Sequence, residues 1–122
     1  MLTFFVLAAL SGAVAVALGA FGAHGLRRHL SAERLATFET GVRYQFYHVV
    51  GLLAAGWMTV QWPQTRLAWV AGWLFVLGTL LFAGALYGLA LSGRRSFGAV
   101  APFGGAAFIA GWLCLALAAW GI

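Results

Sequence analysis

The run TFFVLAALSGAVAVALGAFGA (residues 3–23) contains no charged residue and almost no polar one. At about 1.5 Å per helical residue, a helix of this length crosses the roughly 30 Å of hydrocarbon in a bilayer. A cleaved signal peptide would place a basic segment ahead of a shorter apolar core, and the first base here is Arg27. The run therefore predicts a retained transmembrane helix.

Three further stretches lack charge: residues 44–65, 67–93 and 96–122. Each is continuously apolar rather than alternating, which favours helices over the short strands of a membrane barrel. The sequence thus predicts an all-α integral membrane protein, with one domain over residues 1–122 and four transmembrane helices in an antiparallel bundle. The expected helices cover residues 3–23, 43–62, 67–91 and 98–120.

The composition supports a membrane protein and argues against several other classes. Hydrophobic residues make up 64% of the chain and charged residues 7%, whereas a soluble domain has about 25% charged residues. The net charge of +5 comes from arginines that flank apolar runs, so we expect the lipid bilayer, and no nucleic acid, as a partner. The lone Cys114 excludes an intrachain disulfide and is predicted to be a packing residue.

Arginine placement predicts the orientation of the chain. In a four-span protein the first and third connections lie on the same side of the membrane. They hold six of the seven bases: Arg27, Arg28, Arg34, Arg43, Arg94 and Arg95. Only Arg66 lies in the second connection. Because basic connections stay in the cytoplasm, we expect both termini on the outer side.

Small residues predict how the helices meet, since they let helix backbones approach closely within lipid. The first run carries such a row at steps of three and four residues, beginning at Ala8 and ending at Gly22. The predicted packing glycines are Gly12, Gly19, Gly22, Gly84, Gly88, Gly104 and Gly111.

The polar residues concentrate in FETGVRYQFYH (38–48). Ser31 can cap a helix, and apolar residues then recur at helical spacing, which predicts a short interfacial helix over 31–42 that bends into the second span. Two interpretations of the polar stretch remain open. Glu39 pairs with Arg43 in a collar at the membrane surface, or Glu39 turns inward to form a polar cluster at the cytoplasmic mouth of the bundle. The candidate cluster comprises His24, Glu39, Arg43, Tyr44 and His48.

Motifs for known chemistries are missing from the sequence. It contains no nucleophile elbow, phosphate-binding loop, haem-attachment motif or zinc-protease motif. We therefore expect a protein that is not an enzyme and has no cofactor. The pattern leaves open whether the polar cluster holds a metal.

Three stretches carry a resemblance to a known family: LGAFGAHGL (18–26), FETGVRYQFYHVVGLL (38–53) and APFGGAAFIAGWL (101–113). In this order they resemble the transmembrane protein 256-like family, also called domain of unknown function 423. The resemblance implies a small multi-pass protein of the bacterial inner membrane or of mitochondria, and implies no activity.

Two functional hypotheses follow. The first is an interaction or accessory protein that associates through its small-residue faces, with itself as a homo-oligomer or with a larger membrane complex. The alternative is a small transporter or a metal- or ligand-handling protein that uses the cytoplasmic polar cluster.

Overall fold

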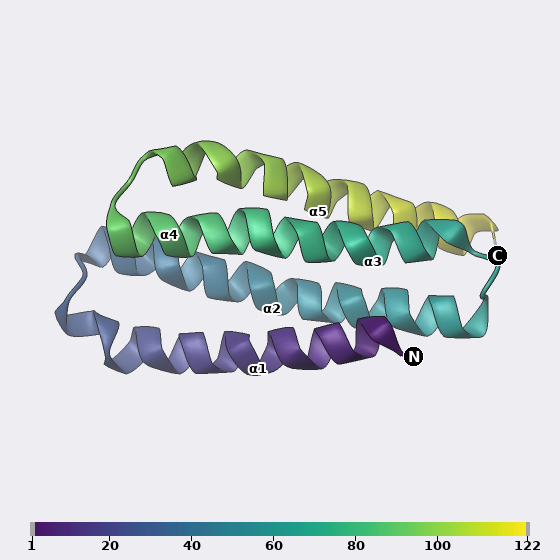
Figure 1. The fold of residues 1–122 in the computed structure, drawn as a ribbon, viewed down its shortest axis with the longest axis horizontal. Coiled ribbons are helices and arrows are strands. Elements are labelled where there is room, and N and C mark those ends of the chain that lie inside the picture. The colour runs from purple at the N-terminus through teal and green to yellow at the C-terminus, as the bar shows by residue number, and fades with distance from the viewer. Residues whose placement is uncertain (1, 122) are drawn as a thin grey trace.

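The computed structural model describes residues 2–121, and the regular structure within that range is helical. The α-helices are α1 (Thr3–His24), α2 (Ala32–Gln61), α3 (Arg66–Gly78), α4 (Gly84–Ser92) and α5 (Ser96–Gly121). A 3-10 turn, η1 (Leu26–Arg28), follows α1, and a π-helical turn, η2 (Thr79–Ala83), joins α3 to α4 in one continuous rod. Figure 1 shows the rods α1, α2, α3–α4 and α5 side by side in this order, with successive rods joined at alternate ends. The prediction of an all-helical protein is confirmed.

The second rod differs from the prediction of an interfacial helix over 31–42 followed by a span over 43–62. Ser31 does cap the helix, because its Oγ accepts from the Arg34 N–H at 3.2 Å. The helix then runs without interruption from Ala32 to Gln61. At Gly41 the helix packs on α4, because the Tyr87 ring and the Ala83 carbonyl lie directly against this glycine. The two expected segments, 31–42 and 43–62, thus form one continuous helix.

Glycines mark the places where neighbouring rods come closest. Along α1, Gly12, Gly19 and Gly22 face Val49, Val42 and Phe38 of α2. Along α5, Gly104 lies against the backbone of η2 at Leu81 and Phe82, and Gly111 lies against the Phe75 ring. Gly88 of α4 lies against Phe97 of α5. These six glycines sit where the sequence places packing contacts.

Gly84 is the exception among the predicted packing glycines. No neighbouring atom lies within 4 Å of the position that a Cβ would occupy there, and the residue is exposed. The π turn immediately before it explains the difference. The Gly84 N–H donates to the carbonyl of Thr79, five residues earlier, so the turn holds one residue more than an α-helical turn. The π turn therefore shifts the α4 face out of the register expected for an unbroken α-helix.

Three of the rods are long and apolar enough to cross a membrane: α1, the continuous rod Arg66–Ser92, and α5. The second rod, α2, does not meet that criterion, because Tyr44, Gln45, Tyr47 and His48 lower its mean hydropathy.

The close approach at Gly104 gives a direct test of the packing. Gly104→Ala would drive a methyl group into the backbone of η2, and we expect it to lower the free energy of unfolding by about 1–3 kcal/mol. Gly84→Ala is the matched control, because it meets open space and ordinary helical backbone angles. It should be neutral or add about 0.5–1 kcal/mol. Unfolding in mixed detergent micelles measures both, and equal effects of the two substitutions would contradict the packing described.

Candidate functional site

The five residues of the predicted polar cluster lie in three separate places. His24 is exposed at the end of α1. Glu39 and Arg43 are exposed and line a shallow groove beside Gly19, where Arg43 donates from Nη2 to Oγ1 of Thr40 at 3.4 Å. His48 is buried against α5 and contacts Tyr44 of its own helix. Of the two interpretations that the sequence leaves open, the inward cluster of His24, Glu39 and His48 therefore does not form, and residues 2–121 contain no group of three or more His, Cys, Asp or Glu that could hold a metal.

His48 lies beside Phe108, near the middle of α5. The two rings stack with centroids 3.4 Å apart and planes 7° from parallel. Only 5% of His48 is exposed.

The partners of His48 fix its protonation state. Nδ1 lies 2.6 Å from the carbonyl oxygen of Tyr44, and Nε2 lies 3.1 Å from Nε1 of Trp112. A carbonyl can only accept and an indole N–H can only donate, so we assign the neutral tautomer with its proton on Nδ1. Both ring nitrogens are thus engaged, and His48 ties α2 to α5 instead of presenting a free metal ligand.

Gln45 forms a second polar junction, which joins three helices. Its Oε1 accepts from the Tyr87 hydroxyl of α4 at 2.6 Å. Its Nε2 donates to the carbonyl oxygen of Ser11 in α1 at 3.0 Å and lies 3.3 Å from the Ser11 hydroxyl. Gln45 is 5% exposed. A buried amide is costly in an apolar setting unless it is hydrogen-bonded, and both ends of this one are.

Gln45 is not among the predicted site residues, although the sequence carries a signal for it. Gln45 lies in an apolar stretch, where an amide without hydrogen bonds would be destabilising. Its presence there predicts that it has hydrogen-bond partners on other helices. Its partners were not readable, because Ser11 and Tyr87 are 34 and 42 residues away in the chain.

Arg34 makes the third polar connection between rods. Its Nε donates to the carbonyl oxygen of Ala90 at 2.7 Å, near the C-terminal end of α4. The guanidinium also lies against Gly93, which ends α4 with a φ of +72°. A cation is favourable at a helix C-terminus, where carbonyl groups lack helical partners. This contact holds the start of α2 against the end of α4.

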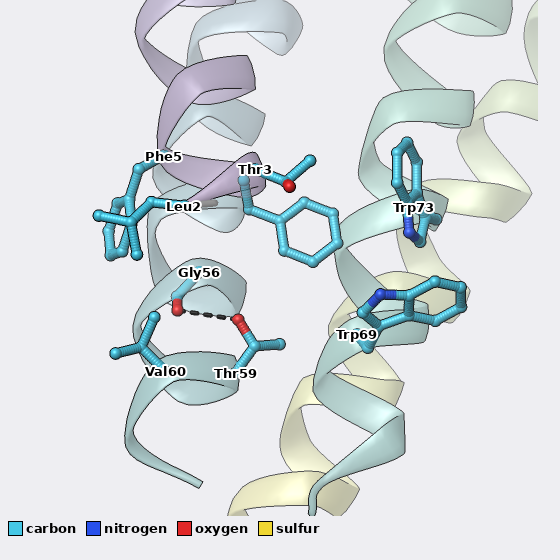
Figure 2. A pocket seen from close by; sticks show the side chains of 9 residues that line it. Leu2, Thr3, Phe5, Gly56, Thr59, Val60, Trp69 and Trp73 are labelled. Atoms are coloured by element: carbon cyan, nitrogen blue, oxygen red, sulfur yellow. Dashed lines mark hydrogen bonds between the residues drawn. The ribbon is translucent and has the colours of Figure 1, made fainter. Parts of the chain in front are cut away.

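A hollow of about 250 Å³ lies at the opposite end of the molecule, near the start of α1. Figure 2 shows Trp69 and Trp73 of α3 on one side of it and Thr59 of α2 on the other. The Thr59 hydroxyl donates to the carbonyl of Gly56 in its own helix at 2.9 Å. No residue lining this hollow is titratable, so it offers no acid–base or metal chemistry.

Comparison with known proteins identifies relatives along most of the chain. A family described as "Protein of unknown function (DUF423)" matches residues 18–105. A UPF0382 membrane protein of Staphylococcus saprophyticus is 46% identical over 96% of each chain. One from Bacillus subtilis is 39% identical over 98% of this chain and 97% of its own. The UPF0382 inner membrane protein YgdD of Escherichia coli is 40% identical over 93% of this chain and 86% of its own. No solved structure matches the chain significantly.

Removing one hydroxyl group from the Gln45 junction should lower the stability of the protein. Tyr87→Phe leaves Oε1 of Gln45 without its donor, and we expect the free energy of unfolding to fall by about 0.5–1.5 kcal/mol. Tyr47→Phe is the control, because Tyr47 is 54% exposed and should change stability by less than about 0.5 kcal/mol. Unfolding in mixed micelles compares the two. A Tyr87→Phe protein as stable as the wild type would show that the junction contributes nothing.

Proposed function

The chain belongs to the DUF423 family, and we propose that it is a four-span protein of the bacterial inner membrane that has no catalytic activity of its own and acts by lateral association in the bilayer. The relatives named as membrane proteins, one of them an inner membrane protein of Escherichia coli, support the location.

The exposure pattern of α2 supports a fourth span. Between residues 44 and 60 its two strongly polar side chains, Gln45 and His48, are buried. Its exposed side chains there are aromatic or aliphatic: Tyr44, Phe46, Tyr47, Val50, Leu53, Trp57 and Val60. A helix that faced water would show the reverse pattern. The low mean hydropathy of α2 therefore reflects polar groups turned inward, which a transmembrane helix tolerates when they are paired.

Residue pairings between neighbouring rods support an antiparallel bundle. Gly12 meets Val49 and Gly22 meets Phe38, so residue numbers along α2 fall as those along α1 rise. With crossings in alternate directions, six arginines lie at one end of the bundle and Arg66 at the other. The positive-inside rule then places both termini outside the cytoplasm.

One observation carries the proposal of lateral association: α1 has small residues on two faces. Ala8, Ala15 and Gly22 are buried against α2. A second row, exposed on the other side, consists of Ala9, Ala13, Ala17 and Ala20. Only 17% of the apolar window of α1 is buried, against 28% for the α3–α4 rod and 33% for α5.

A second copy of the chain fits the outer face of α1 best. Small residues four apart allow close helix approach in lipid, and a face of this kind is complementary to itself across a two-fold axis. The small-residue faces of α5, by contrast, are already occupied by α3 and η2. The face available for association is therefore the outer row of α1 and not the inner seams.

The transporter or metal-handling alternative loses its main support. It requires His24, Glu39, Tyr44 and His48 around one ligand, whereas His24 and Glu39 are exposed and both nitrogens of His48 are engaged.

Association through α1 is testable by substitution on its outer face. We expect the wild-type protein to be a dimer in lipid nanodiscs, and Ala13→Leu with Ala17→Leu to shift it to monomer, because larger side chains separate the helix backbones. Ala106→Leu is the control, since Ala106 is also exposed, on α5. Single-molecule photobleaching counts the copies in each disc.

A disulfide test provides a second measurement. In a Cys114→Ala background, Ala13→Cys should cross-link under mild oxidation and Ala106→Cys should not. A monomeric wild-type protein, or equal cross-linking at both positions, would contradict the proposal.

A further inference from the structure

A groove of about 240 Å³ runs between α1, α2 and the α3–η2 rod. Leucine and valine side chains form most of its walls, and Leu10, Val14 and Leu80 are half exposed or more at its rim. Three polar residues from three rods interrupt these walls: Ser11, Gln45 and Thr79. The groove is larger than the roughly 150 Å³ cavity that accommodates benzene in an engineered protein.

The Thr79 hydroxyl differs from four other helical hydroxyls of the chain. Thr37, Thr40, Thr59 and Ser92 each donate to a backbone carbonyl three or four residues earlier. Within residues 2–121, Oγ1 of Thr79 is the buried side-chain oxygen or nitrogen that has no hydrogen-bond partner. An unpaired buried hydroxyl is destabilising, and its presence needs a reason.

The hydroxyl group of Ser11 is a second hydrogen-bond donor beside the groove. Its hydroxyl oxygen lies within reach of the Gln45 amide N–H, at 3.3 Å. The described part of the chain shows no acceptor for the proton of that hydroxyl. Gln45 itself is already paired with Tyr87 and Ser11. The residues that line the groove therefore include two hydroxyl groups whose protons have no acceptor, and no charged group, which suits a neutral ligand with an acceptor oxygen.

The position of Thr79 narrows the ligand class. Thr79 is the midpoint of the continuous rod Arg66–Ser92, so it lies about 20 Å of helix from either end. The ester carbonyls of phospholipids lie near the headgroups, outside the hydrocarbon core. An acceptor oxygen that reaches this depth must belong to a molecule that dissolves in hydrocarbon.

The backbone at Thr79 is also irregular. The π turn begins at this residue, and its carbonyl accepts from the Gly84 N–H five residues later. Single π turns within α-helices occur frequently at functional sites. The groove, the unpaired hydroxyl and the π turn thus coincide at one place.

We propose that this groove binds a neutral, lipid-soluble carbonyl compound of the quinone type, whose oxygen accepts hydrogen bonds from Ser11 and Thr79. The ligand enters from the bilayer past Leu10 and Leu80. A threonine in a helix has two accessible χ1 wells, so the Thr79 hydroxyl turns from its covered position towards the ligand. The groove is not lined by Ala9, Ala13, Ala17 or Ala20, so the substitutions that test it leave the outer row of α1 unchanged.

The experiment compares two probes of the same shape. Calorimetric titration of the full chain in nanodiscs uses 2-methyl-1,4-naphthoquinone, and 2-methylnaphthalene serves as the probe without carbonyl groups. We expect saturable binding of the quinone and at least about tenfold weaker binding of the hydrocarbon. Equal affinities, or no saturable binding of the quinone, would overturn the proposal.

Substitutions then identify the two donors. Thr79→Val and Ser11→Ala each remove one hydroxyl, and each should weaken quinone binding about 3- to 10-fold. Ser11→Ala keeps the backbone carbonyl that accepts from Gln45, so the junction persists. Thr37→Val, outside the groove, is the control and should bind like the wild type. Wild-type affinity in both Thr79→Val and Ser11→Ala would refute the assignment.

A stability measurement separates a binding role from a structural one. Without ligand, Thr79→Val should raise the thermal midpoint, because it removes an unpaired buried hydroxyl at constant shape. Added quinone should stabilise the wild type more than this variant. A lower midpoint for ligand-free Thr79→Val would show that the hydroxyl supports the fold, and would contradict the proposal.

Discussion

The hydrocarbon core of a bilayer offers no hydrogen-bond partner, so every polar group at that depth must find its partner within the protein. In the four-span arrangement that we propose, this constraint acts most strongly on α2, which carries the buried amide of Gln45 and the buried imidazole of His48. Gln45 is paired with α1 and α4, and His48 with its own helix and α5. The two residues are three apart, so one turn of α2 connects it to all the other rods. The helices are arranged so that each polar side chain in that turn has hydrogen-bond partners.

Close packing makes these bonds attainable. A hydrogen bond between side chains of adjacent helices needs the backbones to be near, and glycine permits this. Phe75 illustrates the result: its fully buried ring lies against Gly51 of α2 and Gly111 of α5. The same ring faces His48, with centroids 5.6 Å apart. Small residues and aromatic rings thus hold the imidazole in an apolar setting, where its two hydrogen bonds are strong.

The sequence predicted features that depend on local chemistry. Gaps between charges located the three apolar rods, Ser31 marked the start of α2, and glycine spacing located six of the seven predicted close contacts. Features that depend on distant partners were missed or misplaced. The contact of His48 with α5 depends on Trp112, which is 64 residues away in the chain, so the local sequence does not show it. The Gln45 junction joins residues from three helices, and the π turn at Thr79 has no signature in its own residues. Gly84 was misassigned because that turn shifts the face of α4.

The most direct test of this arrangement is whether α2 crosses the membrane with its polar turn inside. Glu33 and Gln64 are exposed at the two ends of α2. In a Cys114→Ala background, Glu33→Cys and Gln64→Cys are treated with a membrane-impermeant maleimide in sealed spheroplasts and in inverted vesicles. The arrangement predicts that Gln64→Cys reacts only in spheroplasts and Glu33→Cys only in inverted vesicles. Reaction of both cysteines from the same side would contradict a transmembrane α2, and with it the inward pairing of Gln45 and His48 on which the bundle rests.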